Sequence, residues 1–444
     1  MATNRYIGNA ANVARTYTVT FAKGGGADWA AADTATATVN TKALVVTMGS
    51  AVTTAALAGT AFKKAWNGTA SAANEYTANF DASGHGEFAE MTATDDGAGV
   101  ITLTGDTAGK EITVTSVTEV TAGTGTATLA SVTAADGYNN WDSAKNWSSA
   151  AVCSDGDIVI FQRDSTSCLY GLSDTNMTPA SLAIDAEYEG YIGLPRTNVD
   201  VTALPYSEYR TTELTIADAA DATNVAVSIG EGTGDGSRRL NINFTDSQYT
   251  ATVYRTGARL LDGVPPCLLY GSHASNSLNV LRGDVGVGIY ATSATFATIR
   301  VGYITNQSTD AVLTCGANAG LSSCTLTQLG GTVYIESALS AAEILGGTLN
   351  TIGTGTLGTL QIGGTCNYRS TGTVTAADVR TGGVLNCNGN AGATITTLTL
   401  HPGFTVIDEE GLMTFTNLVF DECGFQDGVL RLGRDISDVD ITYV

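Results

Sequence analysis

The sequence predicts a mostly β protein, in which a small N-terminal α+β or β-sandwich-like domain precedes a parallel β-helix, a form of solenoid. Two observations lead to this prediction. Strand patterns rich in Val, Ile and Thr run through almost the whole chain, with one helical segment near its start. In the last third, paired glycines recur at short intervals: Gly330-Gly331, Gly346-Gly347, Gly363-Gly364, Gly382-Gly383 and, as a related fifth mark, Pro402-Gly403.

The spacing of these marks indicates stacked repeat units. Successive marks are 16, 17, 19 and 20 residues apart. A unit this short cannot bury its own apolar face, so neighbouring units must stack on one another. The glycines would provide corners with positive φ between the strands. The apolar residues around the marks are then expected to be buried: Leu329, Val333, Leu345, Leu349, Ile362 and Leu385.

Residues 1–16 are predicted to be an N-terminal arm. They are polar and irregular, and they include Arg5 and Arg15. We expect this arm to become ordered only against an assembly partner, because it buries too little apolar surface to fold alone. Deleting the arm should then leave the soluble oligomer unchanged but abolish its incorporation into the assembly.

Residues 17–134 are predicted to form the small domain, which would anchor or space the rest of the chain. Apolar residues at i+4 spacing between Leu57 and Trp66 indicate one amphipathic helix that ends near Asn67-Gly68. A hairpin turn is expected at 95–97. Strands are expected at 17–21, 36–48, 87–94, 100–104 and 111–117.

Residues 135–153 are predicted to be a joint that contains Trp141 and Trp147. The first unit of a solenoid has nothing stacked beneath it, so we expect both indoles to cover that end. The β-helix itself is predicted from 154 to 425, with less regular, loop-bearing units in its first half. Residues 426–444 are expected to be a C-terminal capping strand.

Two parts of the chain resemble known sequences. The run from Trp141 to Trp147, followed by Gly156-Asp157-Ile158-Val159-Ile160-Phe161, resembles the entry into β-helical regions of bacterial surface proteins and phage virion proteins. The segments 87–94 and 101–110 resemble small domains of tailed-phage structural proteins. Together these stretches cover roughly a quarter of the chain.

This resemblance implies a non-enzymatic virion protein, either a decoration (cement) protein or a fibre of the head or tail, with no cofactor. Its partners would be other capsid or tail proteins. Such proteins are usually homotrimers, and we expect a face of Val, Thr and Ala to be buried between subunits because no heptad coiled coil is present. The alternative is a tailspike-type protein that binds or depolymerises a host surface glycan. A bacterial adhesin or autotransporter passenger is disfavoured, because neither a signal peptide nor a translocator barrel is evident.

The chain is strongly acidic, with a net charge of −22 from 21 Lys+Arg and 43 Asp+Glu. Phosphate backbones and anionic membranes would repel it, so neither nucleic acid nor a membrane is an expected partner. No signal peptide and no long apolar run is present, so we expect synthesis in the host cytoplasm and a final location in the virion. The acidity indicates solubility or, alternatively, calcium binding.

The eight cysteines show neither C-x-x-C spacing nor a neighbouring histidine. We expect reduced, buried thiols, with some disulfides or a metal site as alternatives. Cys366 and Cys387 occupy positions that hold Val, Leu or Ile in neighbouring units, so they are predicted to act as small hydrophobic residues. The other six are Cys153, Cys168, Cys267, Cys315, Cys324 and Cys423.

No catalytic, cofactor-binding or metal-binding residue is predicted, because the familiar motifs of nucleophiles, phosphate loops and zinc sites are missing. The three histidines, His85, His273 and His401, lie in unrelated contexts and are expected to be structural. The glycine-rich run 230–236 lacks dinucleotide-binding spacing and is interpreted as a loop between strands.

Clusters of carboxylates are the strongest candidates for chemistry. Two acids on successive units could lie within the roughly 5–9.5 Å that glycoside hydrolysis needs. Few aromatic residues accompany them, so a solvated turn is the favoured interpretation, with a calcium site and catalysis as alternatives. The clusters are Asp155 with Asp157, Asp408-Glu409-Glu410, and Asp421-Glu422.

Overall fold

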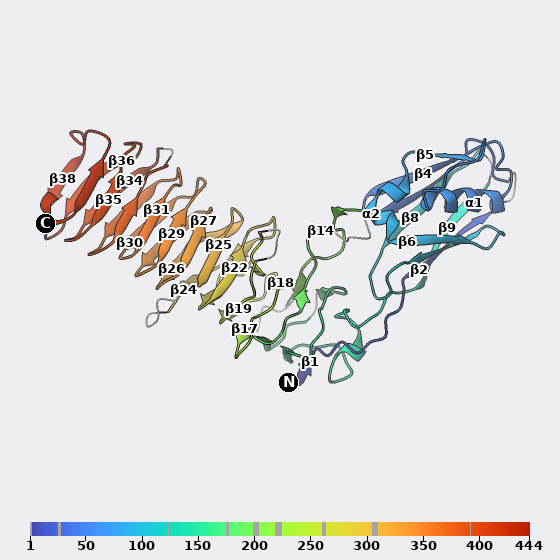
Figure 1. Ribbon diagram of the computed structural model, residues 1–444, viewed down its shortest axis with the longest axis horizontal. Coiled ribbons are helices and arrows are strands. Elements are labelled where there is room, and N and C mark those ends of the chain that lie inside the picture. The colour runs from blue at the N-terminus through green and yellow to red at the C-terminus, as the bar shows by residue number, and fades with distance from the viewer. Residues whose placement is uncertain are drawn as a thin grey trace.

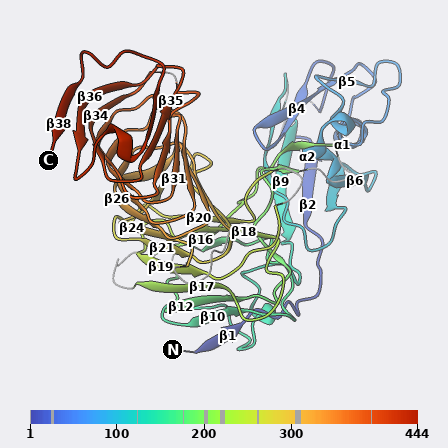
Figure 2. The ribbon, with the colours of Figure 1, turned by 60° about the vertical axis from the view of Figure 1, so that its left-hand side comes forward.

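The computed structural model describes residues 2–24, 28–122, 124–174, 177–198, 204–217, 224–259, 263–303, 310–390 and 392–444. The protein is mostly β and has two parts with separate hydrophobic cores. One part is a small antiparallel domain, and the other is a long stack of parallel strands, called here the parallel stack. The two parts meet at a bend and diverge like the arms of a V (Figures 1 and 2).

The N-terminal domain contains two antiparallel four-stranded sheets and one longer helix. The helix is α1 (Ala55–Trp66), and short helical turns, η1 (Ala82–Gly84) and α2 (Gly86–Ala89), follow it. In spatial order, one sheet is β6 (Met91–Asp95), β7 (Val100–Gly105), β2 (Thr16–Ala22) and β9 (Thr126–Thr133). The other is β5 (Tyr76–Ala78), β4 (Lys42–Met48), β3 (Thr34–Val39) and β8 (Val114–Val120).

The predicted helix is confirmed as α1, and Thr54 caps its start by accepting a hydrogen bond from the Leu57 backbone N–H at 3.2 Å. Leu57 itself is exposed, because it lies on the solvent side of the helix. The strand predicted over 36–48 was wrong as a single strand: residues 40 and 41 turn with positive φ, and β3 and β4 pair as a hairpin. Part of the strand predicted over 87–94 is instead α2.

The larger part consists of two parallel sheets. The first contains β1 (Thr3–Arg5), β10 (Ile158–Phe161), β12 (Ser181–Asp185), β17 (Val225–Glu231), β19 (Tyr249–Val253), β21 (Ser277–Val280), β23 (Ala294–Thr295), β24 (Thr298–Val301), β26 (Ala319–Gln328), β28 (Leu339–Ile344), β30 (Leu357–Ile362), β32 (Val374–Val379), β34 (Thr394–Leu400), β36 (Thr414–Phe420) and β38 (Asp440–Tyr443). The second contains β11 (Ser173–Asp174), β13 (Tyr191–Ile192), β16 (Leu214–Ile216), β18 (Arg239–Asn243), β20 (Cys267–Tyr270), β22 (Gly283–Val287), β25 (Ala311–Cys315), β27 (Thr332–Ile335), β29 (Thr348–Thr351), β31 (Thr365–Tyr368), β33 (Val384–Asn386), β35 (Thr405–Asp408) and β37 (Val429–Leu432).

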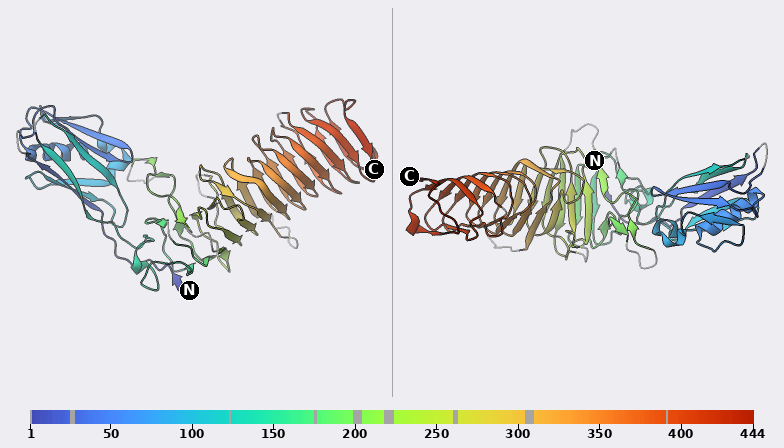
Figure 3. Two further views of the ribbon diagram at one scale, coloured as in Figure 1. Left: turned by 180° about the vertical axis from the view of Figure 1, so that it is seen from behind. Right: turned by 90° about the horizontal axis from the view of Figure 1, so that it is seen from above.

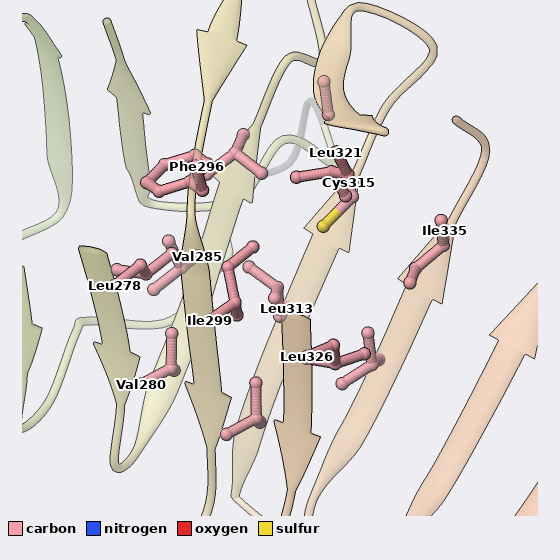
Figure 4. Packing of buried hydrophobic residues seen from close by; sticks show 14 of the residues in the cluster. Leu278, Val280, Val285, Phe296, Ile299, Leu313, Cys315, Leu321, Leu326 and Ile335 are labelled. Atoms are coloured by element: carbon pink, nitrogen blue, oxygen red, sulfur yellow. The ribbon is translucent and has the colours of Figure 1, made fainter. Parts of the chain in front are cut away.

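From β24 onward the chain alternates between the two sheets, and each new strand pairs in parallel with the previous strand of its own sheet. Inward-facing side chains fill the space between the sheets and form one continuous core (Figure 4). The stacked strands form the long arm in both views of Figure 3. This arrangement is compatible with the predicted parallel β-helix.

Four of the six residues predicted to be buried around the glycine marks are fully buried: Val333, Leu349, Ile362 and Leu385. Leu345 is 56% exposed, and Leu329 is half-buried, so these two predictions were wrong or only partly right. The reason lies in the length of the turn. Three residues separate β28 from β29, but only two separate β30 from β31. The residue immediately before the glycine pair is therefore the inward-facing Ile362 in one unit, but the turn residue Leu345 in the other.

The paired glycines provide positive-φ corners in most of the units. Gly331 has φ +73°, and a Cβ there would lie 2.3 Å from the carbonyl oxygen of Ala311, so only glycine fits. The third pair, Gly363-Gly364, has no positive φ. Its turn is also the shorter one, with only two residues between β30 and β31.

The two tryptophans of the joint are buried at the N-terminal end of the parallel stack, as predicted. Trp141 and Trp147 are each 1% exposed and contact one another edge to face, with ring centroids 4.7 Å apart. Trp141 stacks on Phe161 of β10, and Tyr6 packs against Trp147. The η2 turn (Ala144–Asn146) connects the two indoles. Both side chains therefore belong to the core at the N-terminal end of the parallel stack.

The arm predicted at residues 1–16 is not free. Residues 3–5 form β1, which pairs in parallel with β10, and Tyr6 is fully buried. The polar composition was misleading, because an edge strand gains most of its stabilisation from backbone hydrogen bonds. The N-terminal domain is consequently an insertion between two neighbouring strands of the first parallel sheet.

The C-terminal segment 426–444 was predicted to be one capping strand, and this was also wrong. After the η3 turn (Phe425–Asp427), β37 continues the second sheet and β38 continues the first. The segment therefore adds one further strand to each sheet.

Candidate functional site

A buried ionic cluster joins the two parts of the molecule. It is formed by residues 204–213, called here the docking segment, which lie between strands of the parallel stack and reach back to the N-terminal domain. A short antiparallel pair, β14 (Thr197–Asn198) and β15 (Tyr206–Ser207), precedes most of this segment. Arg210 from the segment and Glu90 from the domain are 8% and 5% exposed. The ion pair between Arg210 and Glu90 therefore connects the docking segment to the N-terminal domain.

Arg210 makes a bidentate pair with Glu90: Nη2 lies 3.1 Å from Oε1, and Nη1 lies 3.2 Å from Oε2. Its remaining donors reach Glu208, with Nε at 2.7 Å from Oε1, and the backbone carbonyl of Glu111 at 2.9 Å. Lys110 forms an additional ion pair with Glu90. Two acids and two bases thus neutralise one another, as buried charges must.

Two tyrosines complete the cluster. The Tyr209 hydroxyl donates to Glu90 Oε2 at 3.1 Å, and the Tyr206 hydroxyl contacts both Glu90 and Arg210. Burial raises the pKa of both hydroxyls, so both remain protonated donors. Burial alone would lower the pKa of Arg210, but its bonds to Glu208 and the charge of Glu90 outweigh burial and raise it.

A second contact lies beside the cluster. A Cβ at Gly86 would lie 2.1 Å from the carbonyl oxygen of Leu204 and 2.1 Å from the Tyr206 ring, so the docking segment lies directly on the start of α2. Asn40 donates to the Ser207 carbonyl at 3.4 Å and to Glu87 at 3.1 Å. No feature of the sequence had predicted this interface. Charged residues are rare in this chain, so Arg210 in sequence proximity to two tyrosines and a glutamate was the feature that could have indicated a buried ionic contact.

The acidic clusters proposed for chemistry do not come together. Asp408 ends β35, in the turn from the second sheet to the first, whereas Asp421 follows β36, in the turn back to the second sheet. These turns lie at opposite edges of the stack. Asp408 is fully buried and accepts the backbone N–H groups of Leu412 and Met413 at 3.3 and 3.2 Å. Burial raises its pKa. Its role in the structure is therefore to close a turn.

The neighbouring acids also have partners. Glu409 faces Arg431 at 3.4 Å, and Glu410 accepts the N–H of Gly389 at 3.1 Å. Glu422 has positive φ, and its backbone N–H donates to Val444. These contacts connect successive turns of the stack.

Asp155 and Asp157 attach neighbouring segments to β10. Asp155 accepts the backbone N–H of Thr178 at 2.9 Å. Asp157 accepts the N–H of Ala2 and the side-chain amide of Asn4, both at 2.8 Å, together with the N–H of Ser154 at 3.1 Å. Burial would raise the pKa of Asp157, but these hydrogen bonds prevail and lower it. The carboxylate therefore holds β1 in place.

One of the three histidines contacts two carboxylates that the sequence did not connect with it. His401, which follows β34, lies between Asp378 of β32 and Asp421, which follows β36, with Nε2 at 2.8 Å from Asp378 Oδ1 and Nδ1 at 3.4 Å from Asp421 Oδ2. Arg380 pairs with the other oxygen of Asp378 at 3.1 Å. The other two histidines are elsewhere: His85 packs on Phe80, and His273 accepts the N–H of Ser275.

All eight cysteines are free thiols, and seven are buried. Cys366 lies in register with Leu349 and Leu385, as predicted for a small hydrophobic residue. Cys387 is buried too, although Tyr368 precedes it in the stack rather than an aliphatic residue. Among the described residues, no group of three or more His, Cys, Asp or Glu side chains is arranged to hold a metal ion. Within the same part of the chain, no helix is long and apolar enough to cross a membrane.

The outer surface of the first sheet offers the clearest assembly surface. From β28 to β36 each strand follows a six-residue pattern in which positions one, four and six point inward, while positions two and three both point outward. The outward pairs form what is called here the small-residue face: Ser340-Ala341, Gly358-Thr359, Thr375-Ala376, Thr396-Thr397 and Thr416-Asn417. These ten residues carry no charge and no large side chain; position five of the same strands also points outward, and it holds Glu343, Gln361 and Asp378 in β28, β30 and β32.

Comparison with protein-family models, with curated proteins and with solved structures found no match to this chain.

Proposed function

We propose that the chain is a non-enzymatic structural protein of a phage particle, a trimeric decoration (cement) protein or fibre that projects from the head or tail. The observation that carries the proposal is the rigid, elongated architecture: a long parallel stack and a separate domain that a neutralised ionic cluster holds at an angle. This is the geometry of a spacer or anchor. The partners are other virion proteins of capsid or tail, and the location is the virion.

In this proposal the stack from residue 154 onward is a parallel β-helix. The alternation of the chain between two sheets, the parallel register and the positive-φ corners support this interpretation. Each strand adds a layer whose apolar residues lie on those of the layer before it. A stack of this kind resists bending, because every layer is hydrogen-bonded along its full width.

The proposed trimer buries the small-residue face of each subunit. Small side chains allow close approach of neighbouring sheets, and the absence of charge there avoids repulsion between subunits of net charge −22. Placing arginine at Thr359 and Thr397 should convert the trimer to monomers without unfolding it. Light scattering at micromolar concentration measures this, and a monomeric wild-type protein would remove the trimer from the proposal.

A tailspike-type glycan-binding protein is the second candidate, and one feature favours it. On the outer surface of the second sheet, Asn350, Asn367 and Asn386 form a ladder: the Asn367 amide donates to Asn350 at 2.9 Å, and the Asn386 amide donates to Asn367 at 3.1 Å. The exposed Tyr334 lies in the same row. Amides beside an aromatic ring are suitable for binding a sugar.

Purification of phage particles tests the two candidates together. A structural role predicts that the chain copurifies with intact particles at a fixed copy number. A glycan-binding role predicts that the purified chain binds cell-surface polysaccharide, and that alanine at Tyr334 and Asn367 abolishes binding. A chain that is absent from purified particles would refute both versions.

A further inference from the structure

We infer that the docking segment is a latch, which holds the N-terminal domain at its angle to the parallel stack. Two chain connections alone would leave this angle free, because they lie side by side. Residues 6–15 lead into the domain and residues 134–140 lead out of it. They are bridged by reciprocal hydrogen bonds between Val13 and Asp136, with Val13 N donating at 2.7 Å. Paired connections of this kind form a hinge.

The docking segment is a third connection, away from that hinge. It lies between β13 and β16 of the parallel stack, includes β15, and reaches the domain through Arg210, Tyr206 and Tyr209. Every nitrogen of the Arg210 guanidinium has a partner, and two of these partners, Glu90 and the Glu111 carbonyl, belong to the domain. A rotation about the hinge would have to separate these buried charges. The ion pairs therefore resist rotation.

The latch can open without unfolding either part. The docking segment adds no strand to the sheets of the two cores, and it lies against the start of the short α2. On its other side lies an open pocket of about 340 Å³, lined in part by Tyr209, Arg210 and Thr211 from the segment and by Thr113 and Thr115 from the domain. Solvent already reaches this side. Release would expose the cluster to water and remove Tyr209 from the edge of the domain core, against which it packs, while the strands and the helix α1 that form the two cores would stay in place.

Hydrogen exchange with small-angle scattering tests the latch. In Arg210→Met, Glu90 loses the guanidinium and stays buried beside Lys110, so backbone amides of the docking segment and of 86–92 should exchange roughly tenfold or more faster than in wild type. Exchange in β27 to β36 should not change, and the scattering profile should broaden toward a larger radius of gyration. Arg431→Met is the matched control, because Arg431 forms an exposed pair with Glu409; neither readout should change there.

A second variant opens the latch without removing a charge. Gly86→Ala places a methyl group against the Leu204 carbonyl and the Tyr206 ring, and it should reproduce both changes. Gly84→Ala is its control, since a Cβ there meets nothing within 4 Å. Unchanged exchange and unchanged scattering in both Arg210→Met and Gly86→Ala would overturn the latch. Loss of protection throughout the parallel stack would overturn it as well, because the segment would then be part of the core.

Discussion

The two ends of the parallel stack are finished in different ways. At the N-terminal end, Tyr6, Trp141 and Trp147 are each 1% exposed or less and cover the first layers of the core. At the other end, Tyr443 is 58% exposed and the side chains of Leu430 and Leu432 are only partly buried. A stack of strands has an exposed core and unpaired edges at each end, so an end must be covered by additional side chains or remain in contact with water.

The difference lies in the number of segments that converge on each end. At the N-terminal end, the chain passes three times: through β1, through the joint, and through β10. The inserted domain makes this possible, because the chain leaves after β1 and returns at 134. At the C-terminal end, β37 and β38 are the last strands of their sheets among the described residues. The same kind of layer is therefore deeply buried at one end and half-exposed at the other.

The largest effect is expected at the closed end. Replacing Trp141 and Trp147 by alanine should destabilise the parallel stack by about 3–5 kcal/mol for each indole, because both are fully buried. Chemical denaturation measures the loss, and hydrogen exchange should locate it in β1, β10 and β12. Trp29→Ala is a suitable control, since Trp29 lies in the separate core of the N-terminal domain. A loss below about 1 kcal/mol in the double variant would contradict the closed end.

The middle of the stack provides a reference for both ends. Leu349→Asp should cost about 4–5 kcal/mol, because it buries an unpaired carboxylate at a fully buried position. Leu345→Asp, four residues earlier in the sequence, should stay within about 0.5 kcal/mol of wild type because that side chain is 56% exposed. Thermal denaturation of the pair decides whether the inward register is correct. Equal losses would refute it.

This pair of leucines also illustrates how far the sequence could lead. Stacking was predictable, because paired glycines at nearly constant spacing leave few alternatives to layered strands. The register was not, since turns of two, three or four residues all follow the strands of the first sheet. A better signal was present in the strands themselves. The pattern from Leu357 to Ile362, with two outward small residues in succession, recurs from Val374 to Val379, and it does not depend on the turns.

The arm and the interdomain cluster were hidden for a different reason. Thr3, Asn4 and Arg5 have no apolar pattern, and their strand is defined by pairing with residues more than 150 positions away. Arg210 and Glu90 are likewise 120 positions apart. Local composition carries no information about such partners. The acidic clusters were recognised correctly as groups, but their separation onto opposite turns follows from the sheet topology alone.

A smaller effect at the closed end concerns the carboxylate that holds β1. Asp157→Ala should cost about 1–3 kcal/mol, because the buried side-chain amide of Asn4 and the backbone N–H of Ala2 lose their acceptor. The pKa of Asp157 is lowered in the folded protein, so its contribution is present above the unfolded pKa of about 3.9 and is lost as the pH falls through the folded value. Denaturation at about pH 3 and pH 6 should therefore show wild type losing stability that the variant never had.

Asp408, in the strand next to the last of the second sheet, shows the opposite dependence of stability on pH. Burial raises its pKa, so its contribution is present below the unfolded value and is lost as the pH rises through the folded one. The Asp408 carboxyl makes the free energy of unfolding fall as the pH rises, whereas Asp157 makes it rise. Asp408→Asn should therefore remove this fall. A variant at either position with an unchanged pH profile would show that the carboxylate does not titrate differently in the folded and unfolded protein.

The smallest effect is expected at the open end. Tyr443→Ala should cost about 1 kcal/mol or less, because more than half of the side chain already contacts water and its main partner is a stacked ring, Phe420, at 5.2 Å. Denaturation should be measured at several protein concentrations. A loss of several kcal/mol that grows with concentration would mean that another copy covers this end, since binding of a partner adds its own free energy to the folded state. The two ends would then both be closed, one by the chain itself and the other by assembly.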